Sequence, residues 1–222
     1  QPGGRVAAGA KGESGVELEH QRAGFRCVVP ARHHPDFLAD VDRVELRLRD
    51  AHPVLLLDAA HAQHISALFL DALLGQGTTS ACVFPTVHSV SAEALFEQAL
   101  QRGMRIVAGK VLMDRHAPPE LTDDPRDVTA AERACVDLIE RWHGRGRLAY
   151  AVTPRFAPTS SDAQLAMAWR LLRHAPDLYL QTHLAESTEE VQWVRELFPQ
   201  ARSYLDVYAR HGLLGPRSIF AH

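Results

Sequence analysis

Two histidines and one glutamate carry the clearest chemistry in this sequence. An apolar run over residues 178–182 ends at His183, and Glu186 follows three residues later. A second apolar run, residues 218–221, ends at His222. Imidazole nitrogens are frequent metal ligands, and a carboxylate beside a metal-bound water can shuttle protons. The sequence therefore predicts a metal site at the place where these two runs end.

These runs belong to a repeated alternation of strand-like and helix-like segments that begins near residue 58. The predicted strands, all continuously apolar, are residues 78–87, 104–113, 148–153, 178–183 and 218–222. The predicted helices are residues 61–74, 91–102, 129–143, 161–174, 189–197 and 204–211. A Thr-x-x-Glu cap at Thr129 is expected to open the third helix, and Ser160 or Ser161 the fourth. Continuously apolar strands are typical of a parallel sheet that is covered on both faces.

Polar side chains gather where the predicted strands end. They stand at residues 86–88, 114–116, 155, 183–186 and 222. Function at the carboxyl ends of strands is typical of a closed (β/α)8 barrel. An open doubly wound sheet binds ligands there too, but usually through a Gly-rich phosphate turn, which this sequence lacks. We predict an α/β fold: a partial (β/α)8 TIM-type barrel over residues 58–222, incomplete at both ends.

Residues 1–57 have a different character. Their apolar positions follow no clear period, and we expect this segment to be irregular or mistranslated. The chain has no initiator Met and ends directly after a strand-like run, so we expect a fragment of a longer protein.

Bulk composition excludes several classes of partner. The 222 residues carry a net charge of −3, which gives no reason to expect nucleic acid or a membrane surface as partner. The three cysteines are far apart, so a disulfide framework is not expected and a reducing compartment fits. We expect a cytoplasmic protein with a small-molecule substrate, and a homodimer is left open.

Five motifs in residues 58–222 resemble a known family in their order and spacing. They are GKVLMDR (109–115), TPRFAPTS (153–160), QTHLAE (181–186), YLDVY (204–208) and GLLGPR (212–217), the last with FAH at 220–222. Together they resemble the guanine deaminases of the amidohydrolase superfamily. The resemblance implies a metal-dependent hydrolase barrel that converts guanine to xanthine and ammonia with one Zn²⁺ per intact site.

The resemblance also implies roles for individual residues. His183 resembles the zinc ligand of the fifth strand, Glu186 the proton shuttle, and His222 the histidine beside the metal-bound water. Arg155 and Phe156 resemble the residues that hold the purine, and His183 and Glu186 would border the same substrate.

The chain departs from the family pattern at its first strand. The family has a His-x-His metal pair there, whereas RCVVP (26–30) follows AGF (23–25) here. His33 and His34 are adjacent, and neighbouring residues on a strand point to opposite faces, so they cannot replace that pair. The ligating Asp of the eighth strand would lie beyond residue 222. A reading-frame error upstream of about residue 58 is our hypothesis, and translation of the other two frames tests it.

Several interpretations remain open from the sequence. The protein could be another amidohydrolase that acts on a different aminated heterocycle, or a non-catalytic, metal-free relative. Asp114 and Arg115 could order the third loop or touch substrate. His88 and His116 could be pocket walls or structural residues. The three tryptophans, Trp142, Trp169 and Trp193, are predicted to be core or helix-packing residues.

Overall fold

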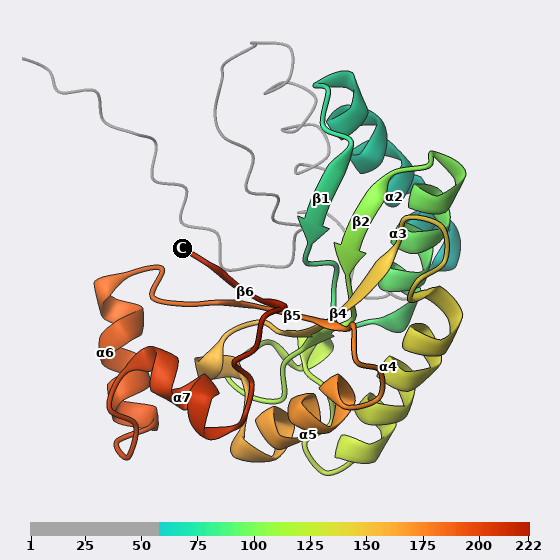
Figure 1. Ribbon diagram of the computed structural model, residues 1–222. Helices are drawn as coiled ribbons and strands as arrows, with labels where there is room; N and C mark the ends of the chain where they lie inside the picture. The colour runs from blue at the N-terminus through green and yellow to red at the C-terminus, as the bar shows by residue number, and fades with distance from the viewer. Residues whose placement is uncertain (1–57) are drawn as a thin grey trace, which may run out of the picture.

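A computed structural model describes residues 58–222 (Figure 1), and the fold in this range is a parallel α/β sheet. The strands are β1 (Ser80–Val83), β2 (Arg105–Ala108), β3 (Val111–Leu112), β4 (Ala149–Pro154), β5 (Tyr179–His183) and β6 (Ser218–Ala221). Their order is β1-β2-β4-β5-β6, with β3 also paired to β4, and every pairing is parallel. The predicted strand–helix alternation is confirmed.

The helices follow one another around the strands (Figure 1). They are α2 (Ala59–Gly75), α3 (Ser89–Gln101), α4 (Val128–Trp142), α5 (Asp162–Leu172), α6 (Thr188–Leu197) and α7 (Tyr204–Arg210), with 3-10 turns at η2 (Pro119–Leu121) and η3 (Ala157–Thr159). None of the helices in residues 58–222 is both long and apolar enough to cross a membrane. Residues 1–57 lie outside the described range, so the domain boundary at residue 58 and the frame-error hypothesis stay predictions.

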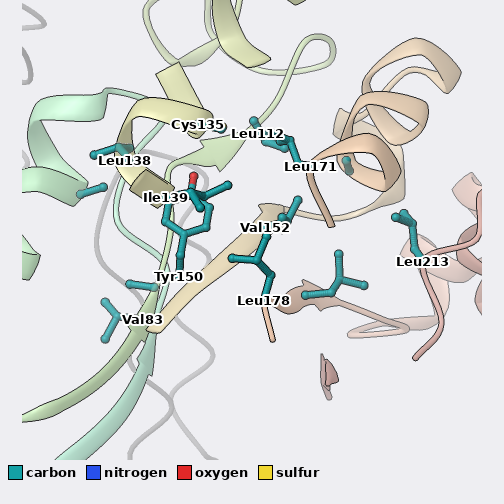
Figure 2. Close-up of a cluster of buried hydrophobic side chains, with 14 of the residues drawn as sticks. Val83, Leu112, Cys135, Leu138, Ile139, Tyr150, Val152, Leu171, Leu178 and Leu213 are labelled. Carbon is teal, nitrogen blue, oxygen red and sulfur yellow. The ribbon is translucent and has the colours of Figure 1, made fainter. Parts of the chain in front are cut away.

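Strand β4 is buried at all six of its positions, because it packs on both faces. Tyr150 and Val152 belong to the large core under the helices, and Figure 2 shows the Tyr150 ring directed toward the α4 residues Cys135 and Ile139. Ala149 and Ala151 point to the other face, where they form a separate small cluster. The continuous apolar character of the sequence here follows from burial on both faces.

The sheet is curved, and the contacts of one side chain demonstrate the curvature. The Gln181 amide of β5 donates to the Val83 carbonyl at the end of β1, at 2.8 Å, and to Thr153 Oγ1 of β4 at 3.1 Å. In the strand order β2 and β4 lie between β1 and β5, which in a flat sheet means about 14 Å of separation. That is farther than one glutamine side chain reaches. The strands therefore form part of a barrel, as predicted.

The single strand predicted over residues 104–113 is wrong. It is divided into β2 and β3, and Gly109 stands at the break. A Cβ added to Gly109 would lie 1.9 Å from the Ala151 carbonyl oxygen of β4. The chain passes so close to the β4 backbone at this point that only glycine fits, and pairing resumes with Val111 beside Thr153.

Two further local predictions need correction. Helix α4 is capped by Asp127, whose carboxylate accepts from the Ala130 amide at 2.9 Å; Thr129 already lies inside the first turn. The Asp127 carboxylate already accepts from a free amide of the first turn, so Asp127 takes the cap position and the predicted Thr129 cap does not form. Trp169 of α5 is 40% exposed, with the Arg173 guanidinium over its ring, and is not a core residue. Trp142 is buried, as expected.

We expect Gly109→Ala to destabilise the fold by at least about 3 kcal/mol, because the new methyl group would overlap a β4 backbone oxygen that cannot move without breaking the sheet. The free energy of unfolding in urea measures the loss. Gly75→Ala is the matched control, since a Cβ there meets no atom within 4 Å. Equal stability of the two variants would contradict the close approach.

Candidate active site

The structure brings three of the predicted site residues together where β5 and β6 end. His183 is the last residue of β5 and pairs with Ala221, the last residue of β6. His222 follows Ala221 directly and therefore lies beside the end of β5. The two imidazole rings stack with their centroids 5.5 Å apart. Glu186 Oε2 lies 3.9 Å from His222 Nε2. Two imidazoles and one carboxylate therefore share one small region of the barrel rim.

The orientation of His183 is fixed by the end of β4. Its backbone amide and its ring Nδ1 each lie 2.9 Å from the same acceptor, the carbonyl oxygen of Arg155. A carbonyl oxygen can only accept, so Nδ1 carries the hydrogen and Nε2 keeps its lone pair. A backbone carbonyl that holds Nδ1–H in this way is the usual support of a metal-binding imidazole.

The charge state of His183 agrees with that orientation. The side chain is buried, and loss of hydration lowers its pKa, an effect that the nearby Arg155 carbonyl and Glu186 carboxylate partly oppose. A lowered pKa keeps the ring neutral near pH 7. Only the neutral imidazole has a lone pair available for a metal ion.

Glu186 reaches the site through a sharp turn between β5 and α6. Ala185 has a φ of 59°, in the left-handed region that residues with a Cβ rarely adopt. Ser187, immediately after Glu186, caps α6 and accepts from the Glu190 amide. The strained turn and the cap together hold the carboxylate at the edge of the sheet, outside the helix.

Arg155 and Phe156 leave β4 beside this cluster. The Arg155 guanidinium lies 5.3 Å from the centroid of the Phe156 ring, and its Nη1 is 3.6 Å from Met113 Sδ. Phe156 meets Trp193 of α6 edge to face, with centroids 6.1 Å apart. The rim thus offers an exposed cation and an aromatic ring next to the two histidines.

Residues 114–116 bond to the loop after β4. Asp114 accepts from the Ser161 amide at 2.8 Å and from the Ser161 hydroxyl. Arg115 donates to the Pro158 and Ala157 carbonyls, and His116 Nδ1 lies 2.8 Å from the Pro158 carbonyl. Of the alternatives that the sequence left open, these contacts favour loop ordering for Asp114 and Arg115.

His88 stands at the start of α3, apart from the His183 contacts. It is the N-terminal cap position of α3, and its backbone amide donates to Thr86 Oγ1 at 3.2 Å. Burial lowers its pKa, and the charge of Lys110 acts in the same direction. His88 therefore does not belong to the cluster of His183, Glu186 and His222.

One residue that contacts the site was not singled out from the sequence. The ring of Phe84, directly after β1, packs against the His183 imidazole with centroids 4.4 Å apart. It covers the imidazole and adds to its burial. Its position at the end of an apolar strand was the available signal, but an aromatic residue there looks like any other core residue.

One of the described residues has the surroundings of a metal ligand. Within residues 58–222 no three His, Cys, Asp or Glu side chains lie close enough together to hold a metal ion by themselves. His183, with its neutral ring and its Nδ1 held by a carbonyl, nevertheless fits the chemistry of a ligand. Any complete ligand set would need donors from outside this range.

The curled parallel sheet, with imidazoles at the carboxyl ends of adjacent strands, has the form of a hydrolase barrel, and the sequence agrees. Residues 30–222 match the amidohydrolase family, and the chain belongs to that family. It is 50% identical over 165 residues to guanine deaminase from Escherichia coli, and 46% identical over 167 residues to a probable guanine deaminase from Deinococcus radiodurans. The matched region covers 74% and 75% of this chain but 37% of each relative, so the chain spans little more than a third of their length.

Comparison with solved structures also finds guanine deaminases. The E. coli guanine deaminase structure superimposes with a TM-score of 0.71 over 74% of this chain and 38% of that one. A guanine deaminase from C. acetobutylicum with guanine bound in its active site is 27% identical, with a TM-score of 0.70 over 75% of this chain and 39% of that one. The chain therefore resembles the guanine deaminases within its family.

The lowered pKa of His183 makes stability depend on pH. The unfolded imidazole binds a proton near pH 6.5, whereas the folded one binds it only at lower pH. At a pH between the lowered pKa of the folded state and 6.5, unfolding therefore takes up a proton. The free energy of unfolding should be highest above pH 6.5 and decrease as the pH falls toward the folded pKa. Urea titrations from about pH 8 to about pH 5.5 measure this decrease.

His183→Asn should reduce that pH dependence, because an amide can still donate to the Arg155 carbonyl but does not titrate. Burial also lowers the pKa of His88, so the difference between parent and variant is the relevant quantity. His64→Asn, at an exposed position of α2, is the control. Identical slopes in the parent and the His183 variant would rule out the assigned burial effect.

Proposed function

We propose that the protein to which this chain belongs hydrolyses guanine to xanthine and ammonia, with one zinc ion, as a step of purine catabolism in the cytoplasm. The observation that carries the proposal is the cluster of His183, His222 and Glu186 beside the Arg155–Phe156 rim. The 50% identity to E. coli guanine deaminase supports the choice of guanine. The free thiols of Cys82 and Cys135 are compatible with a reducing compartment.

In this proposal His183 is a zinc ligand through Nε2, the nitrogen that the Arg155 carbonyl leaves free. When bound, zinc lowers the pKa of a coordinated water so that it can act as a nucleophile near neutral pH. Further ligands would come from outside residues 58–222. Because Nδ1–H is already bonded, the ring need not reorient when the metal ion arrives.

Glu186 is the proposed proton carrier. Its carboxylate would take a proton from the attacking water and return protons to the purine ring nitrogen and to the departing ammonia. His222, within 3.9 Å of that carboxylate, would orient the water and stabilise the charge that develops on it. The overall change consumes one water and one guanine and releases xanthine and ammonia.

Arg155 and Phe156 are the proposed purine-binding pair. The guanidinium would donate hydrogen bonds to the guanine carbonyl, and it stays charged at any physiological pH. The Phe156 ring would pack against the base. Guanine carries a ring carbonyl, one ring nitrogen away from the reacting carbon, and therefore satisfies both contacts, whereas adenine lacks the carbonyl acceptor.

A second candidate is a metal-free barrel relative that binds a ligand without converting it. The observation that favours it is that no three metal-binding side chains in residues 58–222 lie close enough together to hold an ion. The anchored, neutral His183 and the adjacent Glu186 favour the enzyme, because a binding module needs neither arrangement.

The proposal can be tested with a chimera in which residues 58–222 replace the matched segment of E. coli guanine deaminase. We expect a folded chimera to bind zinc and to release ammonia from guanine, with little turnover of adenine. Glu186→Gln should lower kcat by about 10²- to 10⁴-fold, because the proton carrier is lost while the shape is kept. The 222-residue chain by itself should show no turnover.

Glu189→Gln is the matched control, since this carboxylate lies three residues farther along, in the first turn of α6. It should leave kcat unchanged. Zinc content and circular dichroism establish that each chimera is folded and loaded. A folded, zinc-loaded chimera that releases no ammonia from guanine would refute the proposed function.

A further inference from the structure

The hydroxyl of Tyr208, on α7, is the centre of a buried hydrogen-bond cluster behind the candidate site. The residue is fully buried. Its hydroxyl donates to the His183 carbonyl at 2.8 Å, and the Ala157 amide donates to it at 2.9 Å. Thr182 Oγ1 lies 3.0 Å from the same oxygen. None of these residues belongs to α7, so one phenol links three separate parts of the chain.

The contacts use both the donor and the acceptor capacity of a phenol. A tyrosine hydroxyl has one hydrogen to donate and can accept two. The His183 carbonyl takes the hydrogen, and the Ala157 amide fills one acceptor position. Thr182 Oγ1 lies 3.0 Å from the phenol oxygen and 3.3 Å from the Arg155 carbonyl, so the Thr182 hydroxyl belongs to the same cluster. Burial raises the pKa of Tyr208 to about 12, although its hydrogen bonds act to lower it, so the hydroxyl keeps its hydrogen at physiological pH.

The groups that Tyr208 joins are those that set the geometry of the rim. Ala157 follows Arg155 and Phe156 directly, and the Arg155 carbonyl is the acceptor that orients the His183 ring. The His183 carbonyl is held from the other side by Tyr208 itself. The Tyr208 ring also packs against Phe220, two residues before His222, with centroids 5.7 Å apart. The ends of β4, β5 and β6 thus meet at one side chain.

A neighbouring tyrosine, Tyr204, provides a control that distinguishes a positioning role of Tyr208 from a role in packing alone. Tyr204 lies one turn earlier on α7, is also buried, and stacks with Tyr208 at 5.9 Å. Burial raises the pKa of Tyr204, and interactions of its hydroxyl with the Tyr208 hydroxyl and with the Glu190 carboxylate raise this pKa further. Among the described contacts, the Tyr204 hydroxyl makes none to the exits of β4 or β5. Removal of either hydroxyl should therefore cost stability, but only the loss at Tyr208 should disturb the tie between these strands.

We propose that Tyr208 is a positioning residue: its hydroxyl holds residues 155–157 against the end of β5 and thereby keeps the His183 imidazole in the tautomer with Nδ1–H and a free Nε2. The catalytic consequence rests on the proposed function, because a free Nε2 matters only if His183 binds the metal. The structural consequence does not, and it can be measured without substrate or metal.

The test is NMR of the 222-residue chain at a single pH, about 8, with the histidine rings ¹⁵N-labelled and His183 assigned. In the parent the two ring nitrogens of His183 should show a single tautomer with Nδ1–H. Tyr208→Phe keeps the ring and removes the hydroxyl, and we expect it to give a mixture of both tautomers. Its Ala157 amide should exchange about tenfold faster than in Tyr204→Phe, which is the change expected for one lost buried hydrogen bond.

A purely structural role predicts a different pattern. Both variants would then lose similar stability in urea, and both would keep the single His183 tautomer of the parent; that result would overturn the proposal. If Tyr208→Phe does not fold, the parent decides the question: a slowly exchanging Tyr208 hydroxyl proton with a nuclear Overhauser effect to the Ala157 amide supports the proposal, and its absence overturns it. Neither result depends on whether guanine is the substrate.

Discussion

The carbonyl oxygen of Arg155 is the acceptor on which the candidate site depends. It receives the backbone amide and the ring Nδ1–H of His183, each at 2.9 Å, so one oxygen joins β4 to β5 and also selects the imidazole tautomer. Both strands end at this point. The residues that follow, Phe156 after β4 and Glu186 after β5, therefore start from a common fixed position.

Curvature of the sheet determines which side chains share that position. The Gln181 amide crosses the concave face to Val83, and one residue farther along Phe84 covers the His183 ring. In a flat sheet the end of β1 would lie about 14 Å from the end of β5, and neither contact could form. The interior of the barrel thus supplies both a polar brace and an apolar cover for the imidazole, and that cover contributes to the burial that lowers its pKa.

Much of this arrangement could be predicted from the sequence, because it follows from local periodicity. Continuously apolar runs marked the strands, and polar residues after them marked one rim, so His183, Glu186 and His222 were expected to meet. The break at Gly109, the cover by Phe84 and the bonds of Tyr208 could not be predicted in this way. Each depends on a residue far away in the sequence: a β4 carbonyl, the β5 imidazole, and the exits of two strands.

The bonds between the loops after β3 and β4 have a consequence for ligand binding. Asp114 holds the amide and hydroxyl of Ser161, and Arg115 holds the carbonyls of Ala157 and Pro158, so this side of the rim is ordered during folding. A planar ligand that settles beside it would not have to immobilise these segments on arrival. Its affinity would then reflect the contacts it makes, with little configurational entropy left to lose in the protein.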